Sequence, residues 1–274
     1  MSLDTFKIDF FCPRWGATDS WMDFCKRVKA AGYDGVECFL PFEEAEKQEA
    51  LAALKHYELA FIGQYYQSFE SNVAEHAESY ERHIRHLITG NPLFINCQTG
   101  KDWFSFEQNK QLFDVAFRLT KETGVKIVHE THRGKFTFAA HITKDYLQRI
   151  PKLRLTLDIS HWCNVHESLL EDQAEAVDLA IQHTDHIHSR VGHQEGPQVN
   201  DPRAPEWADT LNAHLGWWDK VVERHRKENK PLTINTEFGP ANYMPTLPYS
   251  QEPVANQFDI NVYMMNLLKK RYMV

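Results

Sequence analysis

The sequence has no hydrophobic run that approaches the roughly eighteen apolar residues needed to cross a bilayer. Its first residues, from Met1 to Lys7, also lack the basic segment and long apolar stretch of a secretory signal. We therefore expect a protein of the cytoplasm that has no membrane partner.

Cysteine is scarce, and its arrangement suits neither a disulfide framework nor a thiolate metal site. The five cysteines are odd in number and scattered, and no two of them form a C-x-x-C pair. This is the usage expected in a reducing compartment, where cysteines serve as small apolar core residues.

The chain also lacks an excess of positive charge. Its 30 Lys and Arg against 38 Asp and Glu give a formal net charge of −8, which provides no general attraction to a phosphate backbone. We expect no nucleic-acid partner. The Gly-x-Gly-x-x-Gly pattern is missing after the first expected strand, which disfavours a dinucleotide-binding fold.

What the sequence does have is a regular alternation of short apolar runs with longer segments of helical periodicity. Parallel strands that alternate with helices in units of about 30 residues favour a closed (β/α)8 barrel. No Pro/Ser-rich linker divides the chain, so we expect a single (β/α)8 TIM barrel domain over residues 1–274. We expect strands near 6–12, 34–39, 59–65, 93–98, 125–130, 153–158, 185–190 and 232–237, and helices near 19–31, 43–57, 71–89, 107–123, 138–149, 168–183, 207–228 and 254–270.

Acidic or imidazole side chains stand at the ends of the last four expected strands. They are Glu130, Asp158, His188 and Glu237. A (β/α)8 barrel brings the carboxyl ends of its strands together at one mouth, where catalytic groups collect. Three carboxylates that converge there would repel one another unless a divalent cation neutralised them. The pattern therefore predicts a metal site at this mouth.

The order Glu130, Asp158-x-x-His161, His186-x-His188 and Glu237-Phe-Gly resembles that of the xylose-isomerase-like superfamily of sugar isomerases and epimerases. The segment from Gly32 to Glu37, Gly-Tyr-Asp-Gly-Val-Glu, resembles the same family. The resemblance implies one divalent metal, often manganese, held by Glu130, Asp158, His188 and Glu237. It also implies that His161 contacts a substrate oxygen.

The chemistry of the ligands is consistent with this expectation. Carboxylate and imidazole groups suit Mn²⁺, which we expect first, and also Mg²⁺, Co²⁺ or Zn²⁺. Such an ion would stabilise a metal-bound enediolate when a sugar loses the proton next to its carbonyl group. Our hypothesis is that Glu130 and Glu237 form the acid/base pair that moves this proton in a small sugar or sugar derivative.

Further residues are candidates for substrate binding. Glu37 could bind a sugar hydroxyl, or it could pair with a basic residue at the barrel mouth. Arg190 shares a strand face with His188 and could hold a carboxylate or phosphate, or neutralise the acidic cluster. His132 follows the fifth expected strand, in a segment, Glu-Thr-His-Arg-Gly, that departs from the family pattern and points to a different substrate.

Other functions remain open. A dehydratase of sugar acids or inososes could use the same enediolate to expel a hydroxyl group. A zinc-dependent apurinic endonuclease shares the barrel, but its three-metal site needs histidines where the third and fourth expected strands carry Gln64 and Gln98. A non-enzymatic sugar-binding module would need no acid/base pair. Relatives commonly pair through barrel-top loops, so a homo-oligomer is also an expectation.

Overall fold

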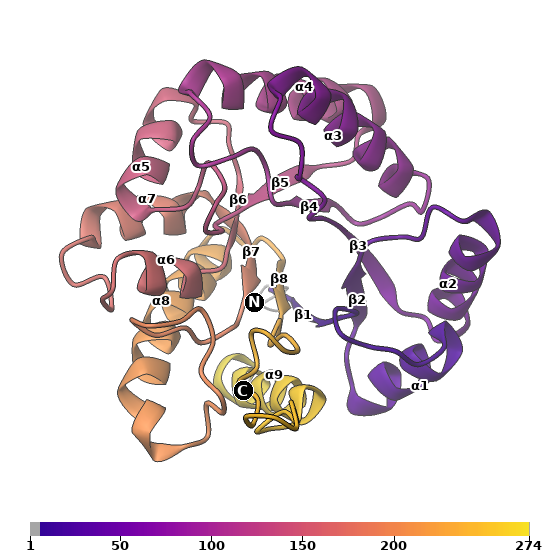
Figure 1. Cartoon of the computed structure of the whole chain (residues 1–274), viewed down its shortest axis with the longest axis vertical. Helices are drawn as coiled ribbons and strands as arrows, with labels where there is room; N and C mark the ends of the chain where they lie inside the picture. Colours follow the sequence, from indigo (N-terminus) through magenta and orange to yellow (C-terminus); the bar gives the residue numbers. More distant parts are fainter. Residues whose placement is uncertain (1–5, 274) are drawn as a thin grey trace, which may run out of the picture.

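The computed structural model describes residues 6–273, and over these residues the chain folds into a closed parallel barrel surrounded by helices (Figure 1). Each strand pairs with the next in the sequence, and the last pairs with the first. This confirms the predicted (β/α)8 TIM barrel. The strands are β1 (Ile8–Pro13), β2 (Gly35–Cys38), β3 (Ala60–Tyr65), β4 (Ile95–Cys97), β5 (Ile127–Glu130), β6 (Leu155–Leu157), β7 (Thr184–His188) and β8 (Leu232–Asn235).

Helices cover the outside of the barrel and alternate with the strands along the chain (Figure 1). They are α1 (Trp21–Ala31), α2 (Glu44–His56), α3 (Val73–Ile88), α4 (Phe106–Thr123), α5 (Ala140–Arg149), α6 (Ser160–Val165), α7 (Ala174–His183), α8 (Ala208–Lys227) and α9 (Gln257–Tyr272), with a 3-10 turn η1 (Pro205–Trp207) before α8. Within residues 6–273, no helix combines the length and the apolar character that crossing a membrane requires.

The inside of the barrel has an apolar floor beneath a polar mouth. Phe11, Ile62, Phe94 and Val128 form a buried cluster separate from the main core. Ile62, Phe94 and Val128 each stand two residues before a polar side chain of the mouth. Because strand side chains alternate with period two, the apolar and polar residues share the inner face of the barrel. The floor therefore keeps water away from the underside of the polar cluster.

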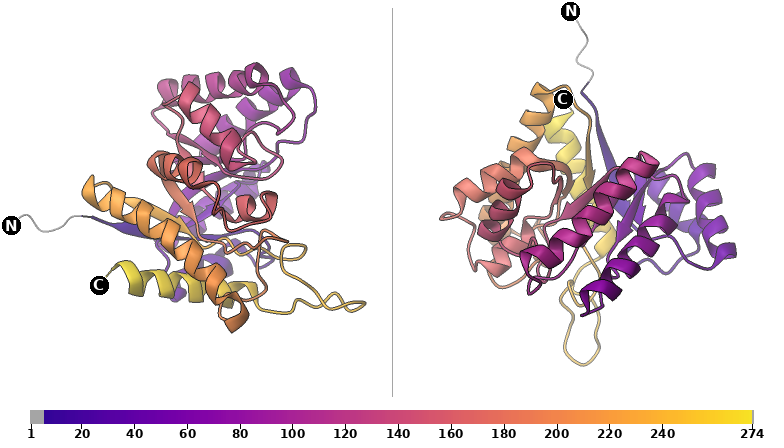
Figure 2. Two further views of the ribbon diagram at one scale, coloured as in Figure 1. Left: turned by 90° about the vertical axis from the view of Figure 1, so that its left-hand side faces the viewer. Right: turned by 90° about the horizontal axis from the view of Figure 1, so that it is seen from above.

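The segment between β8 and α9 leaves the body of the barrel as a narrow projecting loop (Figure 2). An antiparallel bridge between Thr246 and Pro253 joins its two arms. The sequence predicts this long irregular stretch but not its shape. Glu237 is the second residue of this segment, so the first residues of the segment lie beside the barrel mouth.

The sequence-based boundaries hold for most elements to within a few residues, with one larger difference after β6. There the predicted helix over 168–183 begins only at Ala174, as α7, and the short helix α6 precedes it. Ser160 opens α6, and its backbone N–H donates to Asp158 Oδ1 over 3.2 Å. A helix of six residues shows too little periodicity to be detected from sequence.

Candidate active site

The four strand-end residues predicted as metal ligands lie together at the barrel mouth. Glu130 ends β5, Asp158 follows β6, His188 ends β7 and Glu237 comes two residues after β8. One potential ligand atom from each lies within 4.8 Å of those from the others, and all four side chains are buried. The cluster could therefore hold a metal ion.

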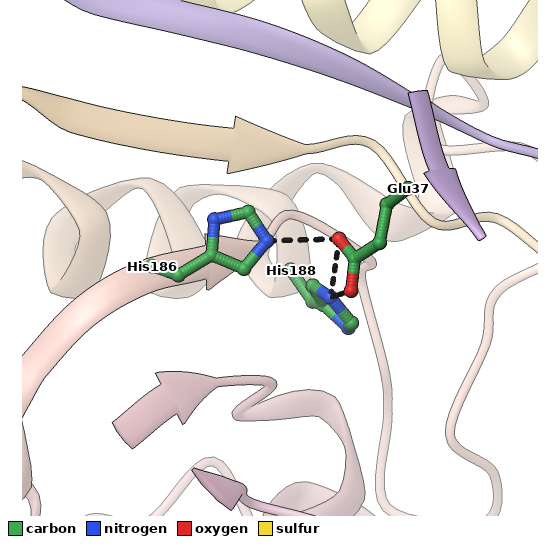
Figure 3. Close-up of side chains that lie close together, drawn as sticks. All are labelled: Glu37, His186 and His188. Atoms are coloured by element: carbon green, nitrogen blue, oxygen red, sulfur yellow. Dashed lines mark hydrogen bonds and ion pairs between the residues drawn. The ribbon is translucent and has the colours of Figure 1, made fainter. Parts of the chain in front are cut away.

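His188 is held in one orientation by Glu37 on β2 (Figure 3). The His188 Nε2–H donates to Glu37 Oε1 over 3.0 Å, and His186 Nε2 lies 2.9 Å from Glu37 Oε2. His186 is in turn fixed by Thr233, whose Oγ1 lies 2.7 Å from its Nδ1. A carboxylate that binds one imidazole nitrogen orients the ring and leaves the other nitrogen for a ligand.

That other nitrogen of His188 has no hydrogen-bond partner among residues 6–273. His188 Nδ1 lies 2.7 Å from Glu237 Oε2 and 3.9 Å from Glu130 Oε2, but not in hydrogen-bond geometry. A buried nitrogen that faces two carboxylates without a bond fits the coordination of a hard or borderline cation. The donors present therefore fit the divalent ion that the sequence predicts.

The charges of the cluster show why a cation would be stabilised there. Burial, reinforced by the neighbouring Glu237 carboxylate, raises the pKa of Glu130 to about 8. Burial also raises the pKa of Asp158, although Arg190 opposes the shift. Burial would lower the pKa of His188, yet the carboxylates of Glu237, Glu37 and Glu130 raise it well above its ordinary value. These buried acids therefore require positive charge beside them.

Three amide side chains, whose contacts the sequence analysis did not predict, hold the carboxylates in place. Gln64 Nε2 donates to Glu237 Oε1 over 2.9 Å, and Gln98 Nε2 donates to Glu130 Oε1 over 3.2 Å. Asn96 Nδ2 donates over 2.9 Å to both Glu37 Oε1 and Glu130 Oε2. The sequence could have indicated two of these residues, because Gln64 and Gln98 also occupy strand-end positions.

A cavity of about 780 Å³ opens above this cluster. This volume falls in the range of small-molecule sites. Of the predicted site residues, the cavity wall includes Glu237, Arg190 and His132. Trp15 and Tyr243 add aromatic faces, and their ring centroids lie 4.9 Å apart in an edge-to-face arrangement. The remaining predicted residues, Glu130, Asp158, His188, His161 and Glu37, lie behind this wall and are fully buried.

Arg190 neutralises the acidic cluster, which is one of the two roles predicted for it. Its Nη2 donates to Asp158 Oδ2, and its Nη1 lies 3.7 Å from Glu237 Oε2. The Nη2 group also lies 2.8 Å from His161 Nε2, and the guanidinium lies over the Tyr243 ring at 4.7 Å. Its charged end is thus engaged by protein groups, and a contact with substrate stays a prediction.

His132 and His161 lie against each other beside the cavity, with their ring centroids 3.9 Å apart. Burial lowers the pKa of both imidazoles well below the ordinary value, so both are neutral at pH 7. His161 accepts from Arg190 at Nε2, and its Nδ1 has no hydrogen-bond partner within residues 6–273. The predicted contact of His161 with a substrate oxygen remains a prediction, because His132 is the member of the pair that reaches the cavity.

For Glu37, the structure shows the pairing with basic groups, and contact with a sugar hydroxyl stays a prediction. Glu37 is fully buried, does not line the cavity, and accepts from His186, His188 and Asn96. Pairing with basic groups, the alternative considered for it, is what the structure shows. The sequence could not decide between the two because Glu37 lies on the inner face of β2, where its depth depends on the barrel register.

Solved structures with the same fold include several sugar-modifying enzymes. The 3-keto-D-glucoside 4-epimerase of E. coli superposes with a TM-score of 0.62 at 13% identity, over 96% of this chain and 100% of that one. The D-allulose 3-epimerase of Methylomonas sp. gives 0.61 at 17% identity, over 97% and 98%. A probable 3-DHS dehydratase of Bacillus anthracis gives 0.61 at 15% identity, over 96% and 99%. At these identities the likeness concerns the fold.

Sequence comparison is more specific about the family. No curated protein matches the sequence. The model of the xylose isomerase-like TIM barrel family matches residues 25–195, which is more than half of the chain and includes Glu130, Asp158 and His188. Glu237 lies beyond this match, and the structure places it beside those three residues. The chain belongs to the xylose isomerase-like TIM barrel family.

Proposed function

We propose that this protein is a divalent-metal-dependent isomerase or epimerase of a small sugar or sugar derivative. The observation that carries the proposal is the convergence of Glu130, Asp158, His188 and Glu237 beneath a cavity of small-molecule size. Sugar epimerases among the solved structures share the fold over nearly the whole chain, which is consistent with this chemistry.

The four converging residues would hold the ion, and we expect Mn²⁺ first, with Mg²⁺, Co²⁺ or Zn²⁺ as alternatives. When bound, the ion supplies Lewis-acid stabilisation of the negative charge that develops on a sugar as it loses a carbon-bound proton. His188 would bind it through Nδ1, because Nε2 is engaged by Glu37.

Glu130 and Glu237 would move the proton. Amide donors hold Glu237 at one oxygen, through Gln64, and Glu130 at both oxygens, through Gln98 and Asn96. Glu237 lines the cavity and would meet the substrate first, and a ligand oxygen of Glu130 lies within 4.8 Å of one of Glu237. One group takes the proton and the other returns it, to the opposite face of the same carbon or to the neighbouring carbon.

Aromatic side chains would orient the sugar and exclude water. Trp15 and Tyr243 face the cavity, and aromatic faces suit the C–H surfaces of sugar rings. Tyr243 also lies over the Arg190 guanidinium, so its position is linked to that of the acidic cluster.

A sugar-acid or inosose dehydratase is the second candidate. One structural neighbour is named a probable 3-DHS dehydratase, and removal of the same proton followed by loss of a hydroxyl group would need the same pair of carboxylates. The amides Gln64 and Gln98 stand where an apurinic endonuclease would need histidines, so a phosphodiesterase is not supported.

The test is a screen of aldoses, ketoses and inososes in D₂O with added Mn²⁺, read by proton NMR. Deuterium incorporation at one carbon identifies the substrate class, and the product distinguishes epimerisation, isomerisation and dehydration. We expect Glu130→Gln and Glu237→Gln to abolish incorporation. Glu223→Gln, the same change at an exposed ion pair with Lys227, is the control and should leave it unchanged. Incorporation that persists in both active-site variants would exclude the proposed acid/base pair.

A further inference from the structure

One side of the cavity wall carries positive charge that the metal cluster does not use. A turn over His132–Lys135 is closed by a hydrogen bond of 3.2 Å from the Lys135 N–H to the His132 carbonyl oxygen. Gly134 occupies the left-handed position of this turn, with φ at 73°. All four residues of the turn line the cavity. The turn thus brings Arg133 and Lys135 to the same wall.

Neither of these cations has an acidic partner. The Arg133 guanidinium contacts only the Asn164 side-chain oxygen, at 3.3 Å, and the Tyr243 ring, at 5.1 Å, within the described part of the chain. Lys135 is 9% exposed, and its ammonium donates to Ser68 Oγ. No carboxylate among residues 6–273 forms an ion pair with either side chain.

A second lysine increases the positive charge at this place. The Lys101 ammonium donates to the backbone carbonyl oxygen of Ser68, the residue whose hydroxyl group binds Lys135. The two ammonium groups therefore lie close together and repel each other. Burial, with Lys101 adding to it, lowers the pKa of Lys135 to about 8, so Lys135 is still mostly protonated at pH 7. Glu130 and Asp102 act on Lys135 from farther away, but a buried ammonium that forms no ion pair is unfavourable for the folded protein.

We infer that this wall binds an oxyanion, and hence that the substrate is an acidic sugar derivative bearing a carboxylate or phosphate group, held by Lys135 and Arg133. This inference rests on the proposed function, because it assigns the far end of the same substrate. The cavity is large enough for a ligand that reaches both the carboxylate cluster and the turn.

The other two arginines that line the cavity, Arg190 and Arg14, already have acidic partners, which supports the choice of Arg133 and Lys135. Arg190 forms ion pairs with Asp158 and Glu237, and the Nη1 of Arg14 lies 3.8 Å from Asp19 Oδ1, which makes an ion pair there as well. Arg133 and Lys135 are therefore the cavity cations, among the residues described, whose charge is left for a ligand. An ammonium and a guanidinium together suit either a carboxylate or a phosphate.

The experiment measures equilibrium binding of inorganic phosphate and of acetate to the Mg²⁺-loaded protein by isothermal titration calorimetry. We expect at least one of the two anions to bind, and its Kd to rise at least tenfold in Lys135→Gln and in Arg133→Gln. Lys135→Arg should retain binding. Lys110→Gln, at an exposed ion pair with Asp114, is the control and should leave the Kd unchanged. Preference for phosphate or for acetate tells which anionic group the substrate carries.

Two results would overturn the inference. One is that neither anion binds the wild-type protein. The other is that binding is the same in wild type, Lys135→Gln and Arg133→Gln, because the anion would then be bound by the metal or elsewhere. Thermal melts of the variants show whether they fold, and Arg133 is half-exposed, so its variant tests the wall even if the Lys135 variant does not fold. The readout requires no turnover. Deuterium exchange into a neutral sugar alone, without anion binding, would retain the proposed function and refute the acidic substrate.

Discussion

Glu37 shows how a residue outside the cavity can determine what happens inside it. Its carboxylate accepts from His188 and from His186, and it also accepts from Asn96, which binds Glu130 as well. Burial opposes ionisation of Glu37, but the two imidazoles lower its pKa below the ordinary value, so it is ionised at neutral pH. Its charge and its position both act on the His188 ring.

We therefore expect Glu37→Gln to weaken metal binding without removing a ligand. Loss of a carboxylate that orients a metal-binding imidazole typically costs 10- to 100-fold in affinity, and we expect a rise in the Kd for Mn²⁺ of about that size. Competition with a fluorescent chelator measures it. Glu223→Gln should bind Mn²⁺ as the wild type does. An unchanged Kd in Glu37→Gln would mean that His188 does not depend on Glu37.

The lowered pKa of Lys135 predicts a pH dependence of anion binding. The ammonium is charged below about pH 8 and loses its proton as the pH rises through that value, so affinity for an anion should be present below pH 8 and fall above it. Lys101, Glu130 and Asp102 are the charged groups that act on Lys135. Sulfate is the suitable probe, because its own charge is constant over this range.

Lys135→Arg is the matched control for this profile, because a guanidinium stays protonated throughout. Its sulfate affinity should stay level between pH 7 and about pH 9, while that of the wild type falls. Glu130, whose pKa is also raised to about 8, gains negative charge over the same range. If the fall persisted in Lys135→Arg, Glu130 rather than Lys135 would be its source.

Individual site residues could be predicted where position alone determines their role. Glu130, Asp158, His188 and Glu237 stand at strand ends, and parallel strands of a barrel bring such ends together. The depth of Glu37 and the charge of the turn at Lys135 could not be predicted. The first depends on the register between β2 and its neighbours, and the second on the approach of Ser68 and Lys101 from other parts of the chain.

At the scale of the elements, β2 has a glycine because the barrel interior leaves no room for a side chain there. A Cβ atom at Gly35 would lie 2.3 Å from Phe11 Cε1 and 2.5 Å from the Ala60 carbonyl oxygen. Phe11 belongs to the apolar floor beneath the site. The close packing of β1, β2 and β3 thus depends on this position.

We expect Gly35→Ala to lower the free energy of unfolding by at least about 1–3 kcal/mol, the usual cost of overpacking a core. Gly216→Ala is the matched control, because a Cβ atom there meets nothing within 4 Å and the residue lies inside α8. Replacing a helical glycine in open space should raise stability by about 0.5–1 kcal/mol. Urea denaturation measures both. Equal effects of the two substitutions would contradict the packing argument.

The order and type of the long elements could be predicted because their periodicity is strong. The helix α3 shows why, since its buried residues recur at spacings of three and four over sixteen residues, and Tyr80, Ile84 and Leu87 are the apolar ones among them. The short elements could not be predicted in the same way. The helix α6 is set by the hydrogen bonds around Asp158 and by burial of Trp162, whose indole N–H donates to the Thr137 carbonyl oxygen over 2.8 Å. The hydrogen bond of Trp162 joins residues 25 positions apart, so the local sequence pattern does not reveal it.

At the scale of the whole molecule, the four candidate metal ligands come from four consecutive strands, which form one half of the barrel. Glu130, Asp158, His188 and Glu237 belong to the ends of β5, β6, β7 and β8, and β8 closes the barrel against β1. An ion held by all four would link these strands at the mouth and would have little affinity for the unfolded chain. Metal binding should therefore stabilise the complete fold and not only the loops around the cavity.

We expect Mn²⁺ to raise the melting temperature and EDTA to reverse the rise. At a free metal concentration of 100 times the Kd, linkage adds about 2.7 kcal/mol, and each kcal/mol shifts the Tm of a protein of about this size by about 2–4 °C, so a rise of several degrees should follow. Asp158→Asn should reduce the shift, since it weakens one of four ligands, whereas Asp178→Asn at an exposed ion pair with Lys220 should not. Differential scanning calorimetry measures all three proteins. A wild-type Tm that does not respond to Mn²⁺ would contradict the proposed metal site. It would leave Arg190 and a protonated His188 as the groups that neutralise the buried carboxylates.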